Sequence, residues 1–126
     1  MIKIQLEHVN FTVSDPGKTA AWMRQVFEWP VRWQGAALGS GQSVHVGGEV
    51  SYIALYCSNA ATAPAPDSYH CLSGLNHIGV VVDDIGKVER RVQKAGFTPH
   101  SHADYTPGRR FYFNDHDGIE YEVVQY

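Results

Sequence analysis

The sequence lacks an excess of positive charge. Its 126 residues include 10 Lys and Arg against 13 Asp and Glu, which gives a formal net charge of −3. Proteins that neutralise nucleic-acid phosphates or adhere to anionic lipid ordinarily carry a basic patch. We therefore expect neither nucleic acid nor a membrane surface as a partner.

Long apolar runs and cysteines are also scarce. No run approaches membrane-spanning length, and residues 1–8 lack the apolar stretch of a signal peptide, so a cytoplasmic protein is expected. The two cysteines, Cys57 and Cys71, are then expected to be reduced thiols.

The two halves of the sequence resemble each other. Residues 7–15 align with residues 76–84 at an offset of 69 residues, which places His8 over His77 and Asp15 over Asp84. Apolar residues alternate through both segments, as is typical of a strand with one buried face. With 44% hydrophobic residues, the chain 1–126 is expected to form a single domain built from two copies of one motif.

Each of these segments is followed by the pattern of one helix and then of three strands. Asp15 and Asp84 are typical N-caps, and Gly96 suits the left-handed residue after a helix. The expected strands are residues 31–38, 42–46 and 50–57, and then 97–102, 109–114 and 119–125. This order predicts an α+β fold of two tandem βαβββ repeats, residues 1–57 and 75–126, whose curved mixed sheets form a cup. Residues 58–74, which are rich in Pro and Ala, are expected to be the linker.

The alternation also gives each repeat's first strand one apolar face and one face that carries a histidine. His8 and His77 should therefore leave their sheets on the side away from the helices. Glu120 and Glu122 share one face of the last strand, where a half-buried carboxylate is costly unless it is paired or coordinated. We predict that His8, His77 and Glu122 bind one divalent metal ion, with Fe(II) favoured over Mn(II), Zn(II), Ni(II) or Co(II). Glu120 is interpreted as a solvated residue, and its coordination in place of Glu122 is the alternative.

Three segments carry a resemblance to a known family, and in register they extend over the whole chain. They are Leu6-Glu7-His8-Val9, Leu75-Asn76-His77-Ile78-Gly79-Val80 and Asp115-His116-Asp117-Gly118-Ile119-Glu120-Tyr121-Glu122. The sequence resembles the vicinal oxygen chelate proteins, which include glyoxalase I, extradiol dioxygenases, methylmalonyl-CoA epimerase and the fosfomycin and bleomycin resistance proteins. The resemblance implies a metalloenzyme that polarises two adjacent oxygens of a small substrate.

The branch of the family is inferred from one missing residue and one partial motif. Glyoxalase I has a fourth ligand, usually Glu, at the position occupied by Ile53, which argues against ordinary lactoylglutathione lyase activity. The remaining ligands resemble those of extradiol ring-cleaving dioxygenases. Residues 111–118, followed by Glu122, resemble the dioxygenase signature, with His116 in place of the usual Pro. Oxidative ring cleavage is therefore the first choice of reaction.

Further side chains are candidates for contact with the substrate. Under the dioxygenase resemblance, Tyr112 would hydrogen-bond a substrate oxygen, and His102 or His100 would act as an acid or base near neutral pH. His100 and Arg109 are the candidates for substrate binding, because a guanidinium suits a carboxylate or a phosphate, and Arg110 beside them is a similar candidate. The alternatives are a packing role for Tyr112 and solvated arginines.

Two other functions stay open. A lyase or isomerase of the same family would need only a Lewis acid and a base. A metal-free drug-binding protein similar to the bleomycin resistance proteins would use aromatic side chains, for which the candidates are Trp22, Trp29, Trp33, Tyr52 and Tyr56. Relatives close their site within one chain or across a dimer, and by that similarity we expect a homodimer.

Overall fold

A computed structural model describes residues 1–37, 39–60 and 62–126 of the chain. The chain forms two compact units, Met1–Thr62 and Ala63–Tyr126, which divide inside the predicted linker. Each unit contains one four-stranded mixed sheet and one α-helix, in the predicted order βαβββ. The α+β fold of two tandem repeats is therefore confirmed. No helix within the described residues is long and apolar enough to cross a membrane.

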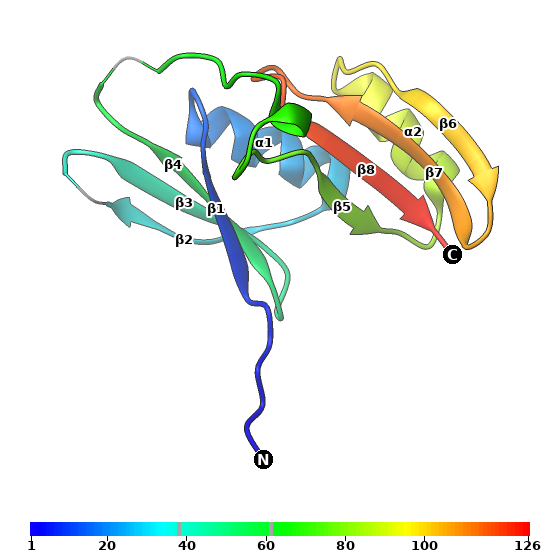
Figure 1. The fold of residues 1–126 in the computed structure, drawn as a ribbon, viewed down its shortest axis with the longest axis horizontal. Coiled ribbons are helices and arrows are strands. Elements are labelled where there is room, and N and C mark those ends of the chain that lie inside the picture. Colours follow the sequence, from blue (N-terminus) through cyan, green and yellow to red (C-terminus); the bar gives the residue numbers. More distant parts are fainter. Residues whose placement is uncertain (38, 61) are drawn as a thin grey trace. The chain divides into compact units, whose positions relative to one another are not determined.

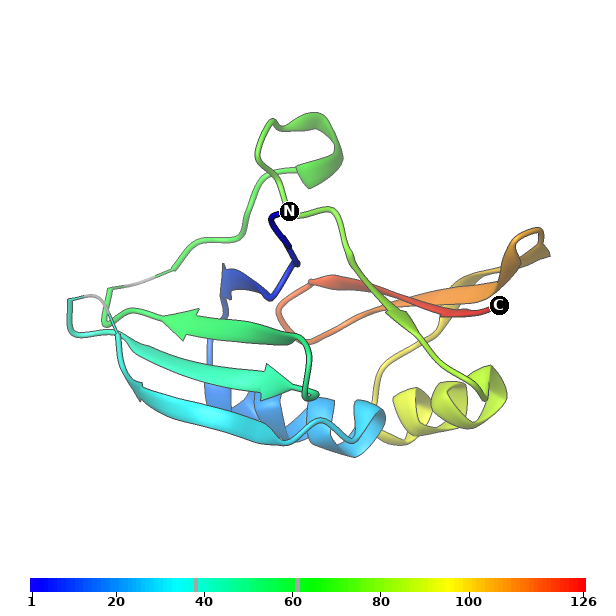
Figure 2. The same ribbon diagram turned by 90° about the horizontal axis from the view of Figure 1, so that it is seen from below.

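The first unit has the strand order β1-β4-β3-β2, with β1 parallel to β4 and the other pairs antiparallel. Its elements are β1 (His8–Thr12), α1 (Pro16–Phe27), β2 (Val31–Ala36), β3 (Gln42–Gly47) and β4 (Tyr52–Cys57). Asp15 caps α1 as predicted, because its side chain accepts the Lys18 N–H at 3.2 Å. Helix α1 contacts β3 and β4 and covers one face of the sheet (Figure 2), where Met23 and Leu55 are fully buried.

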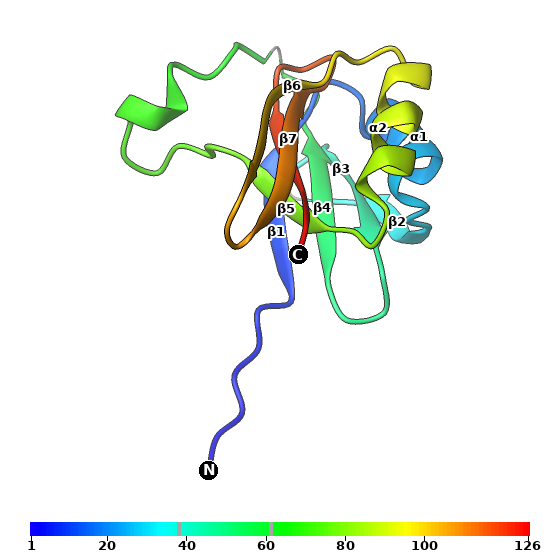
Figure 3. The same cartoon turned by 90° about the vertical axis from the view of Figure 1, so that its right-hand side faces the viewer.

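The second unit repeats this topology, with the strand order β5-β8-β7-β6 (Figure 1). Its elements are the 3-10 helix η1 (Ser68–His70), β5 (Ile78–Val81), α2 (Ile85–Lys94), β6 (His100–Tyr105), β7 (Gly108–Asn114) and β8 (Glu120–Gln125). Asp84 caps α2 through the Lys87 N–H, and Gly96 has a φ of 96° after the helix, both as predicted. Figure 3 shows α2 on one side of this sheet and η1 on the other.

Helix α2 packs on the face of the sheet that carries the aromatic core of the second unit. Phe111, Phe113, Tyr121 and Val123 on that face are at most 1% exposed. Because successive side chains of a strand point to opposite faces, their neighbours on β7 and β8 point away from α2. These neighbours include the polar residues Arg110, Tyr112, Glu120 and Glu122.

Some predicted strand limits were wrong. The strand predicted at 97–102 begins only at His100, because Pro99 has no N–H to donate to the sheet and Phe97 stacks on Phe113 instead. The strand predicted at 50–57 begins at Tyr52, after a turn in which the Gly48 N–H bonds Ser51 O at 3.1 Å. Leu38, in the strand predicted at 31–38, and Ala61, in the predicted linker, lie outside the described residues. Both cysteines are free.

A buried carboxylate organises the turn before β8. Asp115 is 6% exposed. Its Oδ1 accepts the N–H groups of Asp117 at 2.9 Å and Ile119 at 3.0 Å, and its Oδ2 accepts the Tyr121 hydroxyl at 3.3 Å. Gly118, with φ of 81°, supplies the left-handed residue of the turn. Asp115 therefore fixes where β8 begins, although its burial raises the pKa of the carboxyl.

Candidate functional site

His77 and Glu122 meet on the face of the second sheet that points away from α2. His77 immediately precedes β5, and Glu122 lies opposite Gly79 in the parallel pairing of β5 with β8. The Nε2 atom of His77 is 3.1 Å from Oε2 of Glu122, and the two side chains are 31% and 14% exposed. A Cβ atom at Gly79 would meet open space, so this face of β5 is not covered there. Two of the three predicted metal ligands thus lie together in one unit.

Arg110 holds the other oxygen of the Glu122 carboxylate. Its Nη1 donates to Glu122 Oε1 at 2.9 Å, and its side chain is 15% exposed. The guanidinium also lies 5.0 Å over the ring of Tyr105. Because such a charge-assisted bond fixes one oxygen, the second oxygen of Glu122 is directed toward His77. The sequence suggested Arg110 only as a grip for an anionic substrate, and the structure instead pairs it with Glu122.

Tyr112 is the cross-strand neighbour of Glu122 in the antiparallel pairing of β7 with β8. Its ring meets the His77 ring edge-on, with the centroids 5.7 Å apart, and stacks on His100 at 6.3 Å. Burial, followed by the nearby charge of Glu122, raises the pKa of the Tyr112 phenol. The hydroxyl therefore stays protonated near neutral pH and can donate a hydrogen bond.

Tyr69 on η1 contacts the far side of the His77 ring. Its hydroxyl oxygen is 3.0 Å from His77 Nδ1, and the hydroxyl donates to Glu120 Oε2, which is itself 3.4 Å from Nδ1. The hydrogen bond to Glu120 raises the pKa of Tyr69 to about 12. Sequence analysis missed Tyr69, because it lies in a linker without periodicity. It also interpreted Glu120 as solvated, whereas the side chain is 21% exposed and paired.

His8 has a comparable set of partners in the first unit. Its Nδ1 is 2.9 Å from Glu7 Oε1, and the Tyr52 hydroxyl donates to the same oxygen at 3.4 Å. The hydrogen bond with His8 is the main reason why the pKa of Glu7 is lowered. The imidazole also stacks on Tyr52, with the centroids 4.9 Å apart. The sequence identified His8 but not these two partners.

The stack on Tyr52 belongs to a longer row of rings on the first sheet. His45 stacks on Tyr52 at 4.6 Å, and Trp33 lies 4.9 Å from His45. Trp33 is 50% exposed, so part of this row faces solvent. Among the other aromatic candidates, Trp22 is only 6% exposed and meets Phe27 edge-on. Trp22 is therefore a core residue and not a lining residue.

The two histidines of β6 point to opposite faces of the second sheet. His100 Nε2 is 2.7 Å from Asn114 Oδ1, and its ring stacks on Tyr112. His102 instead contacts Glu89 of α2 and stacks on the buried Phe111. A bulge between His100 and Ala103, where Ser101 has φ of 55°, breaks the alternation that would have placed both on one face. His100 is therefore grouped with Tyr112, and His102 is not.

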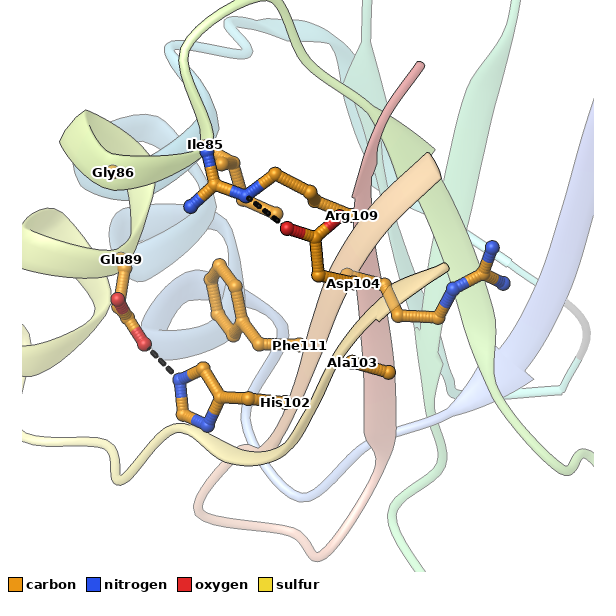
Figure 4. Close-up of a pocket in the computed structure, with 9 residues that line it drawn as sticks. Ile85, Gly86, Glu89, His102, Ala103, Asp104, Arg109 and Phe111 are labelled. Atoms are coloured by element: carbon orange, nitrogen blue, oxygen red, sulfur yellow. Dashed lines mark hydrogen bonds and ion pairs between the residues drawn. The ribbon is translucent and has the colours of Figure 1, made fainter. Parts of the chain in front are cut away.

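Arg109 lies with His102 at a pocket between α2 and the sheet (Figure 4). The pocket has a volume of about 300 Å³, and its lining includes Ile85, Gly86, Glu89, His102, Asp104 and Arg109. Arg109 Nε is 4.0 Å from Asp104 Oδ2, with side chains 60% and 79% exposed, so this ion pair contributes little. The structure therefore separates two predicted site residues, His102 and Arg109, from the face that carries Tyr112 and His77.

The donor atoms suit a divalent metal, although the coordination is incomplete within either unit. In the part of the chain that the structure describes, no three His, Cys, Asp or Glu side chains already form a metal-binding group. An imidazole nitrogen and a carboxylate oxygen that face each other are nevertheless ligands that Fe(II), Mn(II) and Zn(II) accept. His77 and Glu122 fit the predicted role, and His8 belongs to the first unit.

Duplicated βαβββ units, each with a histidine at the start of its first strand, define a class of paired-repeat proteins. The family model of the Glyoxalase/Bleomycin resistance protein/Dioxygenase superfamily matches residues 5–123, and the chain belongs to this superfamily. The resemblance seen in the sequence is thus confirmed. No curated protein sequence is a significant match.

Solved structures show the same fold over nearly the whole chain. A glyoxylase/bleomycin resistance protein/dioxygenase domain from Frankia sp. EAN1pec has a TM-score of 0.81, 21% identity and 98% coverage of both chains. An antibiotic-binding protein from Streptomyces sp. CB03234 has a TM-score of 0.75 and 17% identity, with 99% and 98% coverage. A mutant of the fosfomycin resistance protein FosX from Listeria monocytogenes, complexed with Mn(II) and 1S,2S-dihydroxypropylphosphonic acid, has a TM-score of 0.73 and 18% identity, with 98% and 93% coverage. The TM-scores show that these proteins share the fold of this chain. At sequence identities this low, the similarity extends to the fold alone.

Proposed function

We propose that this chain is a metal-dependent enzyme in which His8, His77 and Glu122 bind one divalent ion, and which acts on a small substrate through two adjacent oxygens. The observation that supports it most directly is the 3.1 Å separation between His77 Nε2 and Glu122 Oε2. An imidazole nitrogen and a carboxylate oxygen this close form a hydrogen bond when the nitrogen is protonated, and they can bind one divalent cation together when it is not. His8 would complete the set, either from the same chain or from a second copy in a homodimer.

The residues around this pair have separate roles in the proposal. The ion, when bound, would polarise the two substrate oxygens and stabilise the negative charge that develops on them. Arg110 would keep Glu122 oriented, and Tyr112 would donate a hydrogen bond to a substrate oxygen. His100 lies against Tyr112 and would accept or return the proton that the substrate exchanges.

Oxidative ring cleavage is the reaction we propose first. Two imidazoles and one carboxylate are a ligand set that suits Fe(II) and leaves coordination positions open for the substrate and O2. In such a reaction O2 is the oxidant, both of its atoms enter the product, and the carbon–carbon bond beside the catechol diol breaks. With Mn(II), Zn(II) or Ni(II) at the same residues, a lyase or isomerase reaction on a substrate with two adjacent oxygens takes its place.

The test is to load metal-free protein separately with Fe(II), Mn(II), Zn(II) and Ni(II), and to measure retained metal after gel filtration. We expect a single ion per chain, together with oxygen uptake on catechols for the Fe(II) form. His8→Ala should lose the ion, whereas the control His45→Ala should keep it, because both rings stack on Tyr52 but only His8 is a proposed ligand. Failure to retain any of the four metals contradicts the proposal. Retention without oxygen uptake contradicts only ring cleavage.

The opposite directions of the β6 histidines give a second prediction. We expect His100→Ala to lower kcat by about a hundredfold, the lower range for loss of a general acid or base. His102→Ala should lower kcat less than His100→Ala and should lower thermal stability more, because His102 pairs with Glu89 and packs on Phe111. Steady-state kinetics and thermal unfolding of the two variants make the comparison. The reverse order of kcat values would favour the original expectation that His102 is catalytic.

The ring row on the first sheet favours a second candidate, a metal-free binding protein for planar aromatic compounds. Trp33, His45, Tyr52 and His8 offer stacked rings, and Trp33 is half exposed. Titration of metal-free protein with the planar dye proflavin, followed by Trp fluorescence, tests it. Saturable binding that Trp33→Ala abolishes, in a chain that retains no metal, would establish this candidate in place of the enzyme.

A further inference from the structure

The partners of His77 Nδ1 are placed to hold the ring proton on that nitrogen. A tyrosine hydroxyl has a single proton, and that of Tyr69 goes to Glu120. The hydroxyl oxygen, 3.0 Å from His77 Nδ1, can then act toward the ring only as an acceptor. This acceptor favours a proton on Nδ1, and Glu122, 3.1 Å from Nε2, favours a proton there when no ion is bound. A metal ion bound at Nε2 leaves Nδ1 as the only place for the ring proton, and there the Tyr69 oxygen accepts it.

The first unit contains the same three residue types around its histidine. His8 Nδ1 faces Glu7, and Tyr52 donates to the same carboxylate. The duplication of the chain does not account for this likeness, because the counterparts of Glu7 and Tyr52 at the 69-residue offset are Asn76 and Tyr121. Asn76 carries no charge, and the Tyr121 ring is fully buried in the core.

The second set is assembled from other parts of its own unit. Its carboxylate comes from Glu120 of β8 and its phenol from Tyr69 of η1. The two units therefore each place a carboxylate and a phenol near the histidine Nδ1, with residues at non-equivalent positions. The contacts differ, because Glu7 is the nearer partner of His8 whereas Tyr69 is the nearer partner of His77. A carboxylate that holds the distal nitrogen of an imidazole is the usual partner of a metal-binding histidine, because it fixes the tautomer and the ring orientation.

We infer that Tyr69 and Glu120 are positioning residues, which keep the proton of His77 on Nδ1 so that Nε2 is the metal-binding nitrogen, and that Glu7 does the same for His8. This inference rests on the proposed metal site. It assigns Glu120 a role through His77 and not as a ligand, and it couples η1, in the segment between the repeats, to metal affinity. Loss of such a partner typically weakens metal binding about 10- to 100-fold.

The experiment measures the dissociation constant of Mn(II) from electron paramagnetic resonance of free Mn(II) added to the metal-free chain. Tyr69→Phe and Glu120→Gln should each weaken binding about 10- to 100-fold. Because both act through one proton, the double variant should be no weaker than the worse single variant. The control Tyr105→Phe keeps its ring against Arg110 and should bind as the wild type does.

A second readout separates positioning from a general loss of structure. Long-range proton–nitrogen NMR correlations of the zinc-loaded wild type should show His77 with its proton on Nδ1. In Tyr69→Phe the Nδ1 proton should exchange with solvent faster, because it has lost an acceptor, while the urea unfolding midpoint stays near that of Tyr105→Phe.

The outcomes distinguish this inference from the proposed function. If the wild type binds no Mn(II), the proposed metal site itself fails. If the wild type binds Mn(II) and both Tyr69→Phe and Glu120→Gln bind it equally tightly, only the positioning role is overturned. If Glu120→Gln abolishes binding while Tyr69→Phe leaves it intact, Glu120 is a ligand and the inference is likewise overturned.

Discussion

Replacement of Glu122 by glutamine is expected to abolish metal binding and turnover and also to destabilise the protein. The amide loses the negative charge that a divalent ion requires, and it leaves the guanidinium of Arg110 without its ion-pair partner. Removal of one member of a largely buried pair typically costs about 3 kcal/mol in the free energy of unfolding. Retained metal after gel filtration and urea unfolding of the metal-free chain measure the two effects.

The double variant Arg110→Met/Glu122→Gln separates the functional effect from the structural one. Methionine removes the unpaired charge but keeps an apolar chain against Tyr105, so most of the lost stability should return. Metal binding should not return, because no carboxylate remains beside His77 Nε2. A double variant that recovers both stability and metal binding would show that Glu122 is only a structural partner of Arg110.

The sequence predicted the fold because local signals and the duplication agree. Asp15 and Asp84 cap their helices, and Gly96 takes the left-handed conformation after α2. The pairing of His77 with Glu122 followed from the alternation of two strands, and this alternation holds in β5 and β8. The alternation of side chains predicts which face each residue occupies wherever a strand is regular.

The same reasoning failed where a strand is irregular or a contact is distant. The bulge at Ser101 turns His102 toward α2, and no residue in that segment signals a bulge. Tyr69 reaches His77 from a linker that has no periodicity, so its role depends on tertiary contacts alone. The sequence showed that Arg110 is charged, but its pairing with Glu122 depends on the register of β7 and β8. The partners of His77 and Glu122 were therefore harder to predict than His77 and Glu122 themselves.

Replacement of Asp115 by alanine is expected to lower the free energy of unfolding by about 3 kcal/mol, because two backbone donors lose their acceptor in a buried turn. These donors are the N–H groups of Asp117 and Ile119, and Tyr121 loses its hydrogen bond as well. The turn sets the start of β8, so the loss also loosens Glu120 and Glu122. Urea unfolding at neutral pH measures the loss, and hydrogen exchange at the Ile119 amide should quicken. Unchanged stability would mean that water replaces the carboxylate.

Asp115→Asn tests the electrostatic part of the same turn. Burial raises the pKa of Asp115 above its ordinary 3.8, so the folded chain holds this proton more tightly than the unfolded chain does. Its contribution to the free energy of unfolding is therefore greatest below the unfolded-state pKa, and it falls as the pH rises through the folded-state pKa. Asparagine has no such proton and keeps an oxygen for the two N–H groups. The stability of the wild type minus that of Asp115→Asn should thus decrease with rising pH across this window and level off above it. A difference that stays constant, or that increases with pH, would show that the hydrogen bonds to the Asp115 carboxylate outweigh its desolvation.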